Sequence, residues 1–437
     1  MNLNIHNETD QTLKKAIWLY FFLVVFEGAL RKWVLPGLSS PLLIVRDPVA
    51  IFIIILATRR GFFTMNFFTI ILSIISVVAI FTAIFLGHQN IYVAVYGARV
   101  FLIHFPLIFI IGNVLNKEDV VQLGKVILCL VPLMTILIGF QFFSPQSAWV
   151  NRGIGGDEGG AGFSGAMGFL RPPGTFSFTN GNTAFYAFST PFILYFWLES
   201  KYANKAILIL ASLGLVAAIP LSISRGLFFS TIVSLLFTFF AISRKPGYMG
   251  KSILIVVCAG LLFVILGQLS FFETATAAFT QRLESANEAE GGVESVLLDR
   301  YFGGMVQALT GTEDLPVFGY GIGMGTNLGS QLLTGELTFL IAEGEWGRLI
   351  GEMGPFLGLI TILTRLVFCI WISIMAYQKL AKGELLPWLL LGYGLLTIPQ
   401  GGWAQPTSLG FSVSIAGLIL ASLNIKNKSL SSQELSN

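Results

Sequence analysis

Charged residues are scarce in this chain of 437 amino acids. Asp, Glu, Lys and Arg make up 11% of it, whereas soluble domains carry about 25%. Hydrophobic residues make up 54%, and charge-free runs such as 67–87 match the ~20 apolar residues that span a bilayer's hydrocarbon core. These features exclude a soluble enzyme, a secreted domain, a β-barrel and a disordered scaffold. The sequence predicts an all-α, polytopic integral membrane protein.

Cysteine and histidine are also rare. The three cysteines, Cys129, Cys258 and Cys369, lie inside apolar runs, where packing is their expected role. His6 and His88 are far apart, and no Cys/His spacing is typical of a metal site. We therefore expect no metal and no cofactor. The net charge of +3 is too small to indicate nucleic-acid binding.

Apolar runs between turn signals predict about twelve transmembrane helices. The run near 385–399 is short enough to be re-entrant, and the sequence shows no internal repeat of the kind found in many secondary transporters. The predicted spans are 16–34, 42–58, 66–87, 92–113, 120–143, 182–198, 205–221, 225–242, 251–270, 346–376, 385–399 and 408–424.

The distribution of basic residues predicts that both termini are cytoplasmic. With the N-terminus placed inside, fifteen of the 26 basic residues fall in cytoplasmic segments, nine on the outer side and two inside spans. Residues 1–437 form a single membrane domain with two long external loops. The first loop is 144–181, and the second is 271–345, whose stretch 275–309 is expected to form amphipathic helices at the interface.

Basic residues differ in type between the two sides. Twelve of the fifteen inner ones are Lys, whereas eight of the nine outer ones are Arg. Chance sampling from a small set is one explanation. The other is an outer site for an anionic headgroup, because the planar guanidinium binds phosphate or carboxylate through two parallel hydrogen bonds.

Arg225 follows Ser224 and precedes Gly226 at the outer start of a span. An arginine there is costly unless it is paired or faces a wet cavity, and the helix N-terminus would add attraction for phosphate. The alternative is an anchor that reaches the lipid headgroups. A nearby segment, from Arg171 to Asn180, contains Pro-Pro-Gly and is expected to form a rigid turn suited to sugar hydroxyls.

A glycine-rich run at 319–325 superficially matches a phosphate-binding loop. No strand precedes it, so a dinucleotide site is not expected. Its glycines, including Gly321 and Gly323, either bring backbone N–H groups to a substrate or pack tightly against a neighbouring segment.

Glu345, Arg348 and Glu352 lie three and four residues apart and therefore share one face of a helix. One interpretation is a salt-bridge ladder within the helix. The other is a functional site on a wet outer face, where a carboxylate beside an arginine acts as a general base. Arg99 and Arg365 lie inside spans, as does His104, for which a packing role is expected.

The order of these motifs resembles that of the O-antigen polymerase/O-antigen ligase superfamily of bacterial envelope glycosyltransferases. The Ser-Arg-Gly at 224–226 resembles the family's arginine motif, and 319–325 resembles its glycine-rich loop. Asp299-Arg300 resembles its second external arginine. The segment 343–354 resembles its closing motif, an acidic residue or His followed nine positions later by Glu and then by Gly.

The resemblance implies a metal-independent, inverting transfer of a glycan on the outer face of the bacterial cytoplasmic (inner) membrane. It implies an undecaprenyl-diphosphate-linked oligosaccharide, membrane lipid, a chain-length regulator and a flippase as partners. Ligases carry His at the position of Glu343, whereas polymerase-like members often carry an acid. The expectation is a polymerase of O-antigen or exopolysaccharide; the alternatives are a ligase to lipid A core and a small-anion transporter.

Under this hypothesis, Arg225 and Arg300 bind the donor diphosphate, and Arg225 stabilises the charge on the leaving group. Arg348 assists them or holds the carboxylates in place. Glu343 or Glu345 takes the proton from the acceptor hydroxyl. The other expected substrate-binding residues are Glu352, Arg171, Asn180, Gly321 and Gly323.

Overall fold

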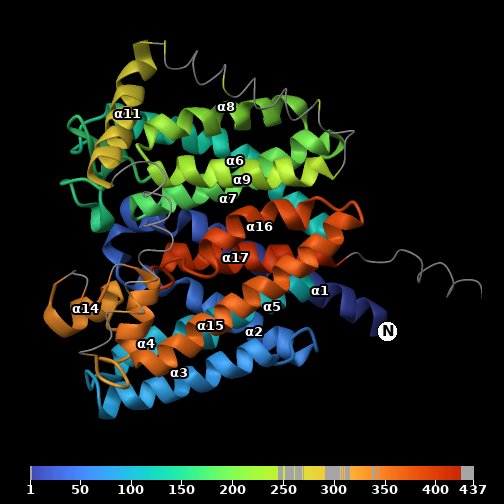
Figure 1. Cartoon of the computed structure of the whole chain (residues 1–437), viewed down its shortest axis with the longest axis vertical. Coiled ribbons are helices and arrows are strands. Elements are labelled where there is room, and N and C mark those ends of the chain that lie inside the picture. Colours follow the sequence, from blue (N-terminus) through green and yellow to red (C-terminus); the bar gives the residue numbers. More distant parts are fainter. Residues whose placement is uncertain are drawn as a thin grey trace, which may run out of the picture.

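A computed structural model describes residues 2–244, 270–290, 315–336, 340–342 and 344–424, with single positions 250, 260, 268, 306, 308 and 310. Most of these residues belong to helices that run roughly side by side (Figure 1). Most of the predicted span 251–270 lies outside the described residues. The same holds for residues 291–305 of the predicted amphipathic stretch 275–309.

Six α-helices precede the long loop that begins at residue 144. Two π-helical segments interrupt them: Leu30–Val34 continues α1, and Val100–His104 joins α4 to α5. The helices are α1 (Asn2–Ala29), α2 (Arg46–Arg59), α3 (Phe67–Phe85), α4 (Ile91–Arg99), α5 (Phe105–Val114) and α6 (Lys117–Phe143).

The remaining described α-helices follow that loop. Among them, α17 is the central one, since it packs against α5, α7 and α16 and is almost entirely buried. They are α7 (Thr179–Leu198), α8 (Lys205–Leu221), α9 (Arg225–Ser243), α11 (Ser270–Glu290), α14 (Asn327–Thr334), α15 (Glu345–Ala381), α16 (Leu386–Thr397) and α17 (Pro406–Leu423).

Asparagine side chains set several of the helix starts. Asn66 and Asn116 each form a capping box with the residue three positions on, and Asn90 and Asn204 accept hydrogen bonds from the first turns of α4 and α8. Such caps satisfy backbone N–H groups that the helix leaves unpaired. They explain why the chain can re-enter an apolar helix after only a short connection.

The expected number of twelve spans is not confirmed. Within the described residues, seven helical stretches are long and apolar enough to cross a membrane, and α8 and α16 are shorter apolar helices. The 12 residues of α16 extend about 18 Å, less than the ~30 Å of a hydrocarbon core. The finding is an all-α, polytopic membrane protein.

The loops and small elements gather at one end of the bundle, which we call the loop end; it carries residues 144–178, α11 and α14 (Figure 1). The start of α1 lies at the opposite end. A two-stranded antiparallel hairpin, β1 (Phe163–Ala166) and β2 (Phe169–Arg171), stands where the sequence indicated only a loop. Met167 and Gly168 both have positive φ, as the tightest hairpin turns require.

The predicted span 346–376 is interrupted near its start. Gly354 has φ 76° and ψ 169°, outside the helical region, and Pro355 follows it. The two limbs of α15 fold back on each other there: a Cβ on Gly358 would lie 2.8 Å from the Ile350 Cα atom. A short limb of nine residues, 345–353, therefore packs beside the start of a longer limb, 355–381.

Candidate functional site

Arg225 is the first residue of α9, at the loop end of the bundle. Ser224 caps the helix by accepting a hydrogen bond from Leu227 N at 3.2 Å, and its hydroxyl lies 2.9 Å from that of Thr183 on α7. Ile223 is buried with φ 45°, a strained conformation for a β-branched residue. Arg225 itself is half-buried and engaged in an interaction.

The segment from Arg171 to Asn180 links the hairpin to α7 and lies close to Arg225. Arg171 ends β2 and is half-buried, and Asn180 is exposed in the first turn of α7. Between them, Ser177 accepts a hydrogen bond from Arg31 at 3.1 Å, and Thr175 donates one to Val25 O at 2.7 Å. The segment is held firmly against the end of α1, as the Pro-Pro-Gly sequence indicated.

The glycine-rich run packs tightly between α3, α4 and α15. A Cβ on Gly323 would lie 2.1 Å from Val93 O, and one on Gly97 would lie 2.4 Å from the Gly323 Cα atom. A Cβ on Gly321 would meet the His88 ring, which itself lies 3.1 Å from Ile322 O. Of the two interpretations of these glycines, the contacts favour close packing.

Glu345, Arg348 and Glu352 share a helix face as the spacing predicted, and they are buried. Arg348 donates to both oxygens of Glu345 at 2.9 and 3.0 Å and to Glu352 Oε2 at 2.5 Å. The second oxygen of Glu352 accepts a hydrogen bond from Gly325 N at 2.8 Å. The ladder therefore joins α15 to the glycine-rich run.

Arg365 completes this network from the other limb of α15. Its Nη1 donates to Glu345 Oε1 at 2.6 Å, and Trp403 N donates to Glu345 Oε2 at 3.1 Å. The Arg365 guanidinium also lies 3.9 Å from the centre of the Trp403 ring and donates to Ile398 O at 2.9 Å. Two arginines and two glutamates cancel in charge, so this buried network is neutral and well satisfied.

Two predicted site residues lie outside the described residues: Arg300 and Glu343. Of the predicted residues that are described, Arg348, Glu345 and Glu352 belong to the neutral network with Arg365. Arg225 and Asn180 belong to the neighbouring starts of α9 and α7.

A second ionic cluster lies where α1, α2 and α4 meet. Of its residues, only Arg99 and His104 were singled out from the sequence. Glu27 accepts from Arg46 Nε at 3.0 Å and lies 3.5 Å from Arg31 Nη1. Arg99 donates to both oxygens of Asp47, at 2.7 and 2.8 Å. Ionisable residues inside membrane spans are candidate functional residues by default, and Glu27 and Arg99 fall inside predicted spans, so that signal was available from the sequence.

Two further residues extend this cluster into the core. His104 lies 2.9 Å from Asp47 Oδ1 through Nε2 and 2.9 Å from the Tyr20 hydroxyl through Nδ1. His104 is completely buried, which agrees with the expected packing role. Arg99 also lies 3.9 Å from the centre of the Tyr96 ring, so an aromatic ring covers its guanidinium.

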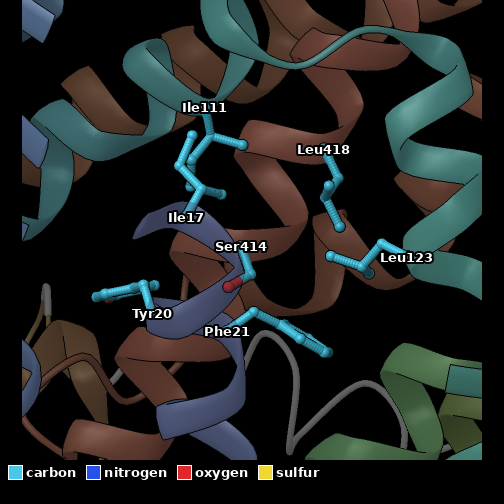
Figure 2. A pocket seen from close by; sticks show the side chains of 7 residues that line it. All are labelled: Ile17, Tyr20, Phe21, Ile111, Leu123, Ser414 and Leu418. Atoms are coloured by element: carbon cyan, nitrogen blue, oxygen red, sulfur yellow. The ribbon is translucent and has the colours of Figure 1, made fainter. Parts of the chain in front are cut away.

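The core beneath this cluster holds a cavity of about 10 Å³, which is at most large enough for one water molecule. Figure 2 shows its lining, in which Ser414 of α17 is surrounded by side chains of α1, α5 and α6. No group of three or more His, Cys, Asp or Glu side chains among the described residues is placed to hold a metal ion.

Comparison with known proteins yields no match to a family model, to a curated protein or to a solved structure. The fold and composition define the class, a polytopic helical membrane protein.

Proposed function

We propose that this protein is a polysaccharide polymerase of the bacterial cytoplasmic membrane. It transfers a glycan from undecaprenyl diphosphate, with inversion, to the hydroxyl of an acceptor sugar, and it elongates O-antigen or exopolysaccharide. The donor oligosaccharide and membrane lipid are its direct partners, and a chain-length regulator and a flippase act with it.

The observation that carries the proposal is the presentation of Arg225. The strained backbone at Ile223 and the Ser224 cap turn the chain at the loop end. As a result, the half-buried Arg225 is the first residue of α9. Strained residues persist where the surrounding structure over-determines them, and they cluster at functional sites. Gly226 next to it is exposed, and a Cβ there would meet nothing closer than 3.6 Å.

The neighbouring start of α7 supports a sugar site beside the diphosphate. Thr183 lies 2.9 Å from Ser224, and Asn180 is exposed three residues earlier on the same helix. In this proposal, Arg225 and Arg300 bind the diphosphate and stabilise the charge that develops as it leaves. Asn180 and Arg171 contact the sugars.

The contacts of Glu345 argue against it as the general base, which leaves Glu343, the other candidate from the sequence, in that role. The two oxygens of Glu345 already accept four hydrogen bonds from Arg348, Arg365 and Trp403, and the residue is only 5% exposed. A carboxylate held in this way is a weak proton acceptor. The neutral network then has a supporting role, and Arg348 holds the carboxylates rather than the donor.

The test uses purified protein in lipid nanodiscs with an undecaprenyl-diphosphate oligosaccharide from the native host. Products that rise by whole repeats on gels and in mass spectra are expected for the wild type and for Arg152→Ala, which removes an exposed arginine paired with Glu158. Arg225→Ala and Glu343→Gln are expected to abolish elongation while the protein remains folded in the membrane. Full elongation by Arg225→Ala would overturn the assignment.

The two alternatives have their own readouts. A ligase would transfer the glycan to added lipid A core and would not form a ladder without it. A small-anion transporter would show uptake without any lipid-linked donor, and that uptake would fail in Arg99→Ala. Arg365, the other arginine inside a predicted span, donates a hydrogen bond to Glu345 in the neutral network, so the transporter test uses Arg99.

A further inference from the structure

We infer that six residues where α1, α2 and α4 meet form a binding site for a phosphate-bearing dianion, separate from Arg225 and from the motifs that carry the proposed polymerase function. We call them the cation cluster. They are Glu27, Arg31, Lys32, Arg46, Asp47 and Arg99.

The charge of the cation cluster is unbalanced. Four positive side chains face two carboxylates, which leaves a formal charge of +2. Lys32 donates to Gly174 O at 2.7 Å and lies 4.4 Å from the Trp33 ring, and it pairs with no carboxylate in the described chain. Burying uncompensated charge is costly, so a surplus of this size calls for a counter-charge.

Hydrogen bonding in the cation cluster is also incomplete. Arg46 and Arg99 are only 2% and 6% exposed, yet Arg46 Nη1 and Arg99 Nε have no hydrogen-bond partner within the described residues. Buried polar atoms are normally satisfied, and an exception requires an explanation. The Glu345 network provides the contrast, because none of its buried side-chain atoms is left without a partner.

The backbone around the cation cluster is irregular at two points. Both π-helical segments in the described chain occur here: Leu30–Val34 carries Arg31 and Lys32, and Val100–His104 directly follows Arg99. Single π turns inside α-helices are frequent at functional sites, since the extra residue re-aims the side chains around it. Gly410 of α17 accommodates Arg46, because a Cβ there would lie 2.2 Å from Arg46 Nη1.

The chemistry fits phosphate better than a monovalent anion. Three guanidinium groups converge, and guanidinium matches phosphate oxygens through parallel hydrogen bonds. A phosphate monoester carries about −1.5 to −2 at neutral pH, close to the formal surplus. The side chains of Arg31 and Asp47 are 10% and 14% exposed, more than the others, so the anion reaches the cluster on their side.

The phosphate has two sources, a free anion or a lipid headgroup. Val34 and Leu35, two and three residues after Lys32, are 62% and 43% exposed, and the Trp33 ring stacks on Trp149 with centroids 5.6 Å apart. Paired tryptophans beside exposed aliphatic side chains are typical of a membrane–water interface. A lipid-borne phosphate would therefore lie at the level of the cluster.

The experiment measures binding and needs no glycan donor. Purified protein in neutral detergent is titrated with pyrophosphate, and protein in nanodiscs of phosphatidylcholine is compared with nanodiscs that also contain phosphatidic acid. Thermal unfolding reports binding in both. If pyrophosphate stabilises the protein, a free anion is sufficient to occupy the site. If phosphatidic acid stabilises it and pyrophosphate does not, the ligand is a lipid headgroup. No stabilisation by either overturns the proposal.

Three variants assign the binding to the cluster. Arg31→Gln is expected to weaken binding at least tenfold, whereas Arg152→Gln removes the same charge at the loop end and is expected to keep wild-type affinity. Glu27→Gln raises the cluster's charge and is expected to tighten binding, an increase that damage to the fold would not produce. Equal affinity in all three variants would overturn the proposal.

The outcome is independent of the proposed polymerase activity. Anion binding that survives in Arg225→Ala, together with loss of elongation, would support both assignments. Elongation without any anion binding at the cation cluster would leave the polymerase assignment intact and remove this one.

Discussion

Arg365 Nη1 lies 2.6 Å from Glu345 Oε1, although the two residues are 20 positions apart within α15. On a straight helix that separation corresponds to about 30 Å. The contact exists because the helix folds back at Gly354-Pro355. This fold-back turns a local salt-bridge ladder into a tertiary network that also holds Trp403 and the glycine-rich run.

Arg365→Gln should be strongly destabilising. It leaves Glu345 buried with one fewer positive partner, and breaking a buried ion pair costs about 3–5 kcal/mol. The measurement is thermal or denaturant unfolding of the purified protein in one detergent. Arg152→Gln is the control, because exposed ion pairs contribute about 0–1 kcal/mol. Equal effects of the two variants would contradict the proposed supporting role of the network.

Gly323→Ala should displace the glycine-rich run from α4. Gly323 has φ 94°, and its new Cβ would lie 2.1 Å from Val93 O, a backbone atom that cannot move alone. Gly335→Ala is the matched control, since Gly335 has φ 79° but nothing lies within 4 Å of the added atom. The control should lose about 1–2 kcal/mol to backbone strain, and Gly323→Ala clearly more. A similar unfolding midpoint for both would show that the close contact is unimportant.

Gly410→Ala should disturb the cation cluster from outside it. The added methyl group would overlap Arg46 Nη1 at 2.2 Å, and overpacking of this kind costs about 1–3 kcal/mol. Gly402→Ala is the control, because the nearest atom to its Cβ would be 4.0 Å away. The unfolding midpoint measures the loss of stability. Titration with pyrophosphate measures whether displacement of the Arg46 guanidinium weakens anion binding. Wild-type values for Gly410→Ala in both measurements would contradict the geometry.

The orientation of the chain can be tested by labelling single cysteines in a variant with Cys129, Cys258 and Cys369 replaced by Ala. Leu332→Cys, on an exposed position of α14, should react with a membrane-impermeant thiol reagent added to spheroplasts. Lys201→Cys, whose side chain is 69% exposed between α7 and α8, should react only after lysis. The reverse pattern would invert the predicted topology.

Much of the architecture follows from local signals in the sequence. Asn66 and Asn116 cap the starts of α3 and α6. Helical spacing alone places Glu345, Arg348 and Glu352 on one face. Such features depend on residues within one or two turns of each other. The Gly354-Pro355 pair was also a local signal for an interruption, which the long apolar run around it concealed.

The sequence by itself determined the class of protein, because scarce charge and long apolar runs leave a membrane as the only solvent in which this chain can fold. Tertiary structure alone decided what the charges do. The Glu345 network closes to neutrality only when Arg365 folds back onto it, and the cation cluster brings Arg99 of α4 to residues of α1 and α2 about 50 positions or more earlier in the chain. Whether a buried charge is compensated depends on distances in space, and the sequence order does not contain them.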